Sequence, residues 1–128
     1  IRMGTAELYR AVEALDEVAD SLVVDLEYLG RPSYMPLFVV LREGRSLTDD
    51  LRARINDAIR RALTARHVPN EIFAVPAIPR TLSGKKLELP VKKLLLGQPI
   101  EKVVNRDAMT NPEALDWFVA FAARRRNA

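Results

Sequence analysis

Apolar residues recur at two spacings along the chain, and the change of spacing separates helices from strands. From Thr5 to Leu15 they recur every three or four residues, and from Leu47 to Thr64 every four, with a polar opposite face. This spacing predicts a helix in each segment. Val18 to Tyr28 instead alternates apolar and polar residues, and Pro36 to Leu41 is almost continuously apolar. We expect both to be strands, the second central in a sheet.

Three shorter segments complete the pattern. Glu71 to Val75 is short and apolar, which predicts a third strand, and Pro90 to Leu96 predicts a short helix with proline in its first turn. Asn111-Pro112-Glu113 is typical of a helix start, with asparagine as the cap. In that last helix Trp117 and Phe121 lie beside the apolar stripe, and we expect them to face a partner.

The order of these elements predicts the α+β class. We expect a small three-stranded, mainly antiparallel sheet with helices packed on it, a lysine-bearing loop and a carboxy-terminal helical extension. The domain is expected to cover residues 1–96 and the extension residues 97–128. The alternation in the first strand predicts a wet face that carries Ser21, Asp25 and Glu27.

Composition excludes several kinds of site. The chain is 48% hydrophobic and 29% charged, which is typical of a globular domain. It has no cysteine, so disulfides and thiolate chemistry are excluded, and its single histidine, His67, is best interpreted as a core or capping residue. We expect no metal site. No apolar run has the length of a membrane span and no signal-peptide pattern is visible, so we expect a cytoplasmic protein without membrane contacts.

The charge balance allows two interpretations. An excess of 20 basic over 17 acidic residues gives a net charge of +3, a weak preference for anionic ligands. The arginines of the long helix and Arg124 to Arg126 could instead form a basic module that binds nucleic acid or an acidic partner. A solvated helix face explains the same arginines, namely Arg52, Arg54, Arg60 and Arg61.

The stretch from Ile78 to Lys93 contains the candidate chemistry. A glycine beside a serine permits backbone angles that other residues resist, so Thr81, Ser83 and Gly84 are expected to shape a tight loop that presents Lys85. A solvated hairpin tip would look the same in composition. We interpret the neighbouring Lys86 as a surface charge.

Two anchors resemble a known family. Arg2 to Glu7 resembles the segment with which the small carboxy-terminal domain of adenylate-forming enzymes begins, and Pro79 to Lys85 resembles the loop that bears their catalytic lysine. Acyl-CoA synthetases belong to this family. The continuation from Lys86 to Lys93, with the extension after it, resembles the acetoacetyl-CoA synthetases among them.

The resemblance implies an ATP-dependent acid–thiol ligase, of which this chain is the mobile carboxy-terminal domain. The partners are then its own amino-terminal large domain and small molecules, not nucleic acid. ATP with Mg²⁺ and coenzyme A are substrates of the whole enzyme, and this domain alone is expected to bind neither. Lys85 would complete the adenylation site, with activity expected only in the longer chain.

The resemblance also points to nucleotide- or coenzyme A-binding residues, namely Arg2, Gly4 and Arg66. Each has an alternative interpretation. Arg2 could be a frayed terminal residue, Gly4 a helix-start glycine and Arg66 a solvated helix end.

Overall fold

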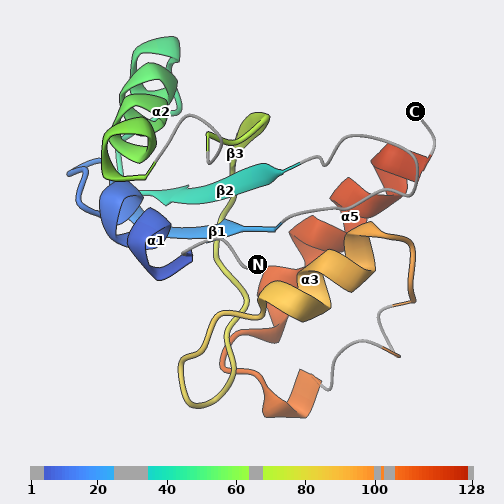
Figure 1. Ribbon diagram of the computed structural model, residues 1–128. Coiled ribbons are helices and arrows are strands. Elements are labelled where there is room, and N and C mark those ends of the chain that lie inside the picture. Colours follow the sequence, from blue (N-terminus) through green and yellow to red (C-terminus); the bar gives the residue numbers. More distant parts are fainter. Residues whose placement is uncertain (1–4, 25–34, 64–67, 100–101, 103–105, 127–128) are drawn as a thin grey trace.

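The computed structural model describes residues 5–24, 35–63, 68–99, 102 and 106–126 (Figure 1). Its helices and strands follow the chain as α1 (Thr5–Glu13), β1 (Val18–Val23), β2 (Pro36–Leu41), α2 (Asp49–Ala62), β3 (Glu71–Ala74), α3 (Glu88–Leu95) and α5 (Leu115–Arg126). Two short 3₁₀ turns, Arg106–Ala108 and Pro112–Ala114, precede α5.

The strands form one sheet in the order β1-β2-β3. The first pairing, β1 with β2, is antiparallel, and the second, β2 with β3, is parallel. The predicted α+β class and the three strands are confirmed. The sheet is mixed, because α2 carries the chain across the sheet before β3 begins, and parallel neighbours need such a crossover.

Helices cover both faces of this sheet. Leu37 and Val39 of β2 pack into a core with residues of α1 and α2, whereas Phe38, between them, packs into a second core with residues of α3 and α5. Figure 1 shows the sheet between these two helix pairs. Burial on both faces explains why β2 is almost continuously apolar.

The prediction that one face of β1 is exposed to solvent is wrong at Ser21. This residue pairs with Val39 and is fully buried. Its hydroxyl donates a hydrogen bond of 2.6 Å to the Glu13 Oε2 atom of α1, so a polar side chain is satisfied on a covered face. Asp25 and Glu27, predicted on the same face, lie outside the described residues.

The prediction that Phe121 faces a partner is also wrong, and Trp117 is half-buried beside it. Both belong to an aromatic cluster with Phe38 and Phe73 from the sheet, in which the Trp117 and Phe121 rings stack at 5.1 Å. Phe121 is only 6% exposed. The last helix therefore packs into the domain core, while the division of the chain after residue 96 remains a prediction.

Among the described residues, no helix is long and apolar enough to cross a membrane.

Candidate active-site loop

The loop around Lys85 is a tight hairpin. Arg80 and Lys86 form an antiparallel bridge, and the Gly84 N–H donates to the Thr81 carbonyl at 2.9 Å to close the turn. Gly84 has φ +90°, a left-handed conformation that side chains disfavour, and no atom within 4 Å limits the space beside it. The glycine is therefore needed for its backbone angle.

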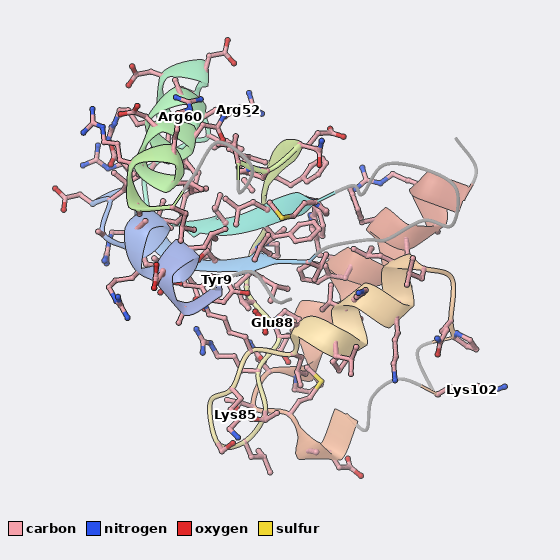
Figure 2. The ribbon with its side chains drawn as sticks, in the orientation of Figure 1. Tyr9, Arg52, Arg60, Lys85, Glu88 and Lys102 are labelled. Atoms are coloured by element: carbon pink, nitrogen blue, oxygen red, sulfur yellow. The ribbon has the colours of Figure 1, made fainter. Side chains whose placement is uncertain are left out.

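Thr81 fixes the backbone of Lys85 from both sides. Its hydroxyl oxygen accepts the Lys85 N–H at 3.0 Å and lies 2.9 Å from the Ser83 hydroxyl, while its own N–H donates to the Lys85 carbonyl at 2.9 Å. The structure thus brings the predicted loop-shaping residues Thr81, Ser83 and Gly84 together around Lys85. The Lys85 side chain is exposed at the tip, as Figure 2 shows.

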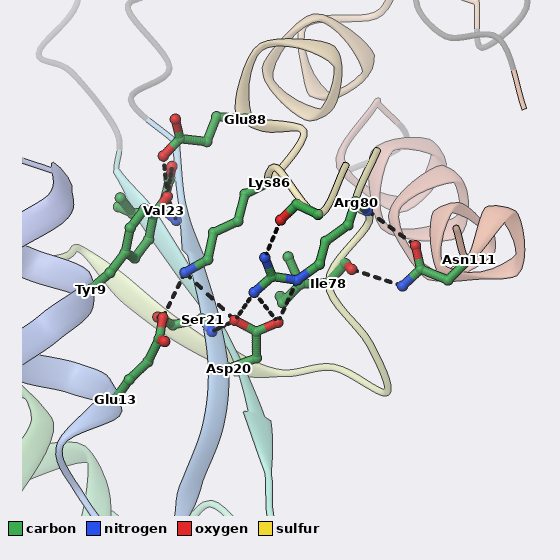
Figure 3. Close-up of polar contacts among 11 residues, drawn as sticks. Tyr9, Glu13, Asp20, Ser21, Val23, Ile78, Arg80, Lys86, Glu88 and Asn111 are labelled. Atoms are coloured by element: carbon green, nitrogen blue, oxygen red, sulfur yellow. Dashed lines mark hydrogen bonds and ion pairs between the residues drawn. The ribbon is translucent and has the colours of Figure 1, made fainter. Parts of the chain in front are cut away.

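Arg80 ties the base of the loop to the sheet. Its guanidinium binds the Asp20 carboxylate of β1, with Nη2 at 2.7 Å from both oxygens and Nε at 3.2 Å from Oδ2 (Figure 3). The same guanidinium donates from Nη1 to the Gly84 carbonyl at 2.6 Å. One side chain therefore connects β1 to the peptide bond immediately before Lys85. A planar fork of donors suits this double contact, which a lysine could not reproduce.

Lys86 is not the surface charge that we predicted. Its side chain is 13% exposed, and its ammonium lies 2.6 Å from Glu13 Oε2, 3.5 Å from Asp20 Oδ1 and 3.4 Å from the centre of the Tyr9 ring. The two neighbouring lysines therefore have opposite surroundings, since side chains alternate along an extended strand. Lys86 anchors the loop to α1 and β1, and Lys85 projects from it.

A third contact lies just beyond the hairpin, at the start of α3. The Tyr9 hydroxyl bonds the Glu88 carboxylate and accepts the Val23 N–H at 3.2 Å (Figure 3). Burial, with the Glu88 hydrogen bond next in size, raises the pKa of Tyr9 well above its ordinary value. The phenol therefore stays protonated and remains a donor to Glu88.

Asn111 has a different role from the helix cap that we predicted. No capping hydrogen bond comes from its side chain. Its Oδ1 instead accepts the Arg80 N–H at 3.0 Å, and its Nδ2 donates to the Ile78 carbonyl at 2.9 Å. The extension thus contacts the lysine loop directly, a contact that local sequence pattern did not indicate.

The structure does not describe the remaining predicted site residues. Arg2, Gly4 and Arg66 lie outside the described residues, as does His67. Their roles stay predictions.

On α2, the arginines are paired with acidic residues. Arg52 contacts Asp49 at 3.1 Å, and Arg60 and Arg61 both contact Asp57. Arg54, predicted as part of a wet face, binds both carboxylate oxygens of Glu17. These pairs offset the positive charge of the helix, so binding of nucleic acid or an acidic partner remains a prediction without structural support.

The fold and the lysine loop together define a class of protein. The chain matches the family of AMP-binding enzyme C-terminal domains over residues 8–85, and it belongs to that family. The match ends at Lys85, so the extension lies beyond the part that the family model describes.

The chain is also similar to individual enzymes that contain such a domain. The chain is 43% identical over 118 residues to acetoacetyl-CoA synthetase of Mus musculus and 44% identical over the same length to that of Rhizobium meliloti (strain 1021). Each comparison covers 92% of this chain and 17% or 18% of the relative. The resemblance stated from the two anchors is thereby confirmed.

Solved structures agree with this assignment. Acetoacetyl-CoA synthetase from Streptomyces lividans superposes with a TM-score of 0.90 at 46% identity, over 98% of this chain and 19% of that one. An acyl-CoA synthetase of Brucella canis gives a TM-score of 0.60 at 26% identity, over 75% of this chain and 17% of that one. This chain therefore spans less than a fifth of the length of these relatives.

Proposed function

We propose that this chain is the mobile carboxy-terminal domain of a longer ATP-dependent ligase. The ligase activates a short carboxylic acid, acetoacetate, as an acyl-adenylate and transfers the acyl group to coenzyme A. Similarity to proteins named acetoacetyl-CoA synthetases supports the reaction class. The observation that carries the role of this domain is an exposed Lys85 on a hairpin whose base is anchored by Arg80 and Lys86.

The first half-reaction brings two anions together. A carboxylate oxygen of the acid attacks the α-phosphorus of ATP, a new P–O bond forms, and the bond to the departing pyrophosphate breaks. In the proposal the Lys85 ammonium contacts both the carboxylate and a phosphate oxygen, lowering their repulsion and aligning the attack. A lysine suits this role because its compact charge sits on a long flexible stem. ATP is bound with Mg²⁺, mainly by the large domain.

Anchoring of the loop matters because catalysis by a single charge depends on preorganisation. A charge that is already in position costs no reorganisation when the reaction occurs, and loss of one such group typically lowers the rate about a hundred- to a thousandfold. Arg80 and Lys86 hold the hairpin, so only the Lys85 side chain needs to adjust to the substrate.

The second half-reaction requires a different arrangement. The coenzyme A sulfur attacks the acyl carbon, a C–S bond forms and AMP leaves. In the proposal the domain rotates and takes Lys85 away. Arg2, Gly4 and Arg66 are then candidates for contacts with the nucleotide or coenzyme A.

The test is Lys85→Ala in the full-length ligase, with Lys102→Ala as the matched control, since Lys102 is an exposed lysine of the extension (Figure 2). Pyrophosphate release without coenzyme A reports adenylation, and thioester formation from pre-made acyl-adenylate reports the second step. We expect only Lys85→Ala to slow adenylation, and only that step. Adenylation at the unmodified rate would refute the role of Lys85.

A further inference from the structure

A segment of the extension pairs with the first strand of the lysine hairpin. Thr81 and Met109 form an antiparallel bridge, the Leu82 N–H donates to the Ala108 carbonyl at 3.0 Å, and the Thr110 N–H donates to the Arg80 carbonyl at 3.1 Å. Met109 is buried and so fixes this segment against the domain. The loop strand that begins at Arg80 therefore has a backbone neighbour on each side, and one of them comes from the extension.

Two side chains of the extension add to this pairing. The Thr110 hydroxyl donates to the Thr81 carbonyl at 2.9 Å. The Asn111 amide reaches the Ile78 carbonyl at 2.9 Å and the Arg80 N–H at 3.0 Å, one on each side of Pro79. Proline has no N–H to donate, so a backbone ladder is interrupted here. The Asn111 amide supplies both a donor and an acceptor across this interruption (Figure 3).

We propose that Asn111 is a positioning residue for Lys85, an inference that rests on the proposed function. The route is short. Asn111 holds the backbone of Arg80, and the Arg80 guanidinium holds both Asp20 and the Gly84 carbonyl next to Lys85. Without Asn111 the Arg80 backbone keeps only its hydrogen bond from the Thr110 N–H on the extension side, and the hairpin tip gains freedom.

This role differs from that of a residue that merely attaches the extension. A purely structural asparagine would, when removed, lower the stability of the whole domain and affect both half-reactions or neither. A positioning residue affects the step in which Lys85 acts, and only while Lys85 is present. Small displacements of a catalytic group are costly, with a shift of about 1 Å able to lower a rate about a hundredfold.

The experiment uses the full-length ligase with Asn111→Ala, and Gln98→Ala as the control, because Gln98 is an exposed amide residue of the extension. We expect Asn111→Ala to slow pyrophosphate release with acetoacetate and ATP by about 10- to 100-fold. Thioester formation from pre-made acyl-adenylate should keep its rate. Amide hydrogen exchange of residues 80–85 should become faster in the same variant.

A double variant separates the two proposals. If Lys85→Ala and Asn111→Ala together are no slower than Lys85→Ala alone, the effect of Asn111 passes through Lys85. The inference is overturned if the two substitutions multiply their effects on adenylation in the double variant. It is also overturned if Asn111→Ala leaves adenylation and amide exchange unchanged. Either result leaves the role of Lys85 intact. Unchanged adenylation in Lys85→Ala would instead overturn the proposed function.

A milder pair of variants covers the case in which Asn111→Ala fails to fold. Thr110→Val removes only the hydroxyl that donates to the Thr81 carbonyl, and Thr110→Ser retains it. Because Thr110 is exposed, neither change disturbs the core. We expect a smaller loss of adenylation in Thr110→Val and near-normal adenylation in Thr110→Ser. Equal rates in the two variants would contradict a brace from the extension.

Discussion

The ion pair between Asp20 and Arg80 offers a direct way to loosen the lysine loop without touching Lys85. Asp20→Asn keeps the size of the side chain and removes its charge. In the protein, this carboxylate accepts from Arg80 Nη2 at 2.7 Å, from the Ser21 N–H at 2.9 Å and lies 3.5 Å from Lys86 Nζ. The substitution therefore weakens the connections of two loop residues to β1.

The burial of the pair sets the expected size of the effect. An exposed ion pair contributes about 0–1 kcal/mol, whereas removing one partner of a fully buried pair costs about 3–5 kcal/mol. The Arg80 and Asp20 side chains are 32% and 19% exposed, which places the pair between these limits. We expect the free energy of opening the loop to fall by about 1–2 kcal/mol, equivalent to a factor of about 5–30.

Amide hydrogen exchange of the full-length protein measures this free energy directly. Segments that open locally exchange according to their own opening free energy, so the amides of residues 81–85 should exchange about 5- to 30-fold faster in Asp20→Asn. Asp16→Asn, at an exposed position between α1 and β1, is the control and should leave them unchanged. Equal protection of the loop in Asp20→Asn and in the unmodified protein would refute the idea that Arg80 holds the hairpin through β1.

Three further predictions test other parts of the same arrangement. Gly84→Ala places a side chain at φ +90°, costing roughly 1–2 kcal/mol, and should slow adenylation. Gly44→Ala, at φ +81° between β2 and α2, should not. Equal adenylation rates in the two variants would contradict a role for the Gly84 backbone angle. Lys86→Met should slow adenylation less than Lys85→Met does in pyrophosphate-release assays, because Lys86 acts through its contact with Glu13; the reverse order would exchange their roles. Because folding raises the pKa of Tyr9, the folded state retains a proton that the unfolded state loses, and the free energy of unfolding should fall as pH rises above about 10. In urea unfolding at a series of pH values, Tyr9→Phe should reduce that dependence, and an identical pH dependence would contradict the assigned environment.

Local pattern predicted the elements that depend on spacing alone. The apolar repeat of four between Leu47 and Leu63 corresponds to α2, and the apolar run from Pro36 to Leu41 corresponds to β2. The Ser83-Gly84 pair indicated the turn because a left-handed backbone angle is a local property. The same turn predicted that Lys85 is presented at its tip, but the pattern did not distinguish Lys85 from Lys86, which was also predicted to be exposed.

Features that depend on distant partners were not predictable in this way. Lys86 is half-buried and pairs with Glu13, 73 residues earlier in the chain, and the Ser21 hydroxyl donates to that same carboxylate. Asn111 occupies a position typical of a helix cap, yet its side chain bonds a loop 31 residues earlier. In each case a polar side chain has two plausible local environments, and only the packing of the sheet and extension chooses between them.

The ratio of the two half-reaction rates in full-length Lys85→Ala shows whether Lys85 acts in adenylation alone. We expect pyrophosphate release to fall about a hundred- to a thousandfold, while thioester formation from supplied acyl-adenylate keeps nearly its original rate. Loss of both rates by the same factor, or of neither, would contradict the claim that this domain carries Lys85 into the adenylation step alone.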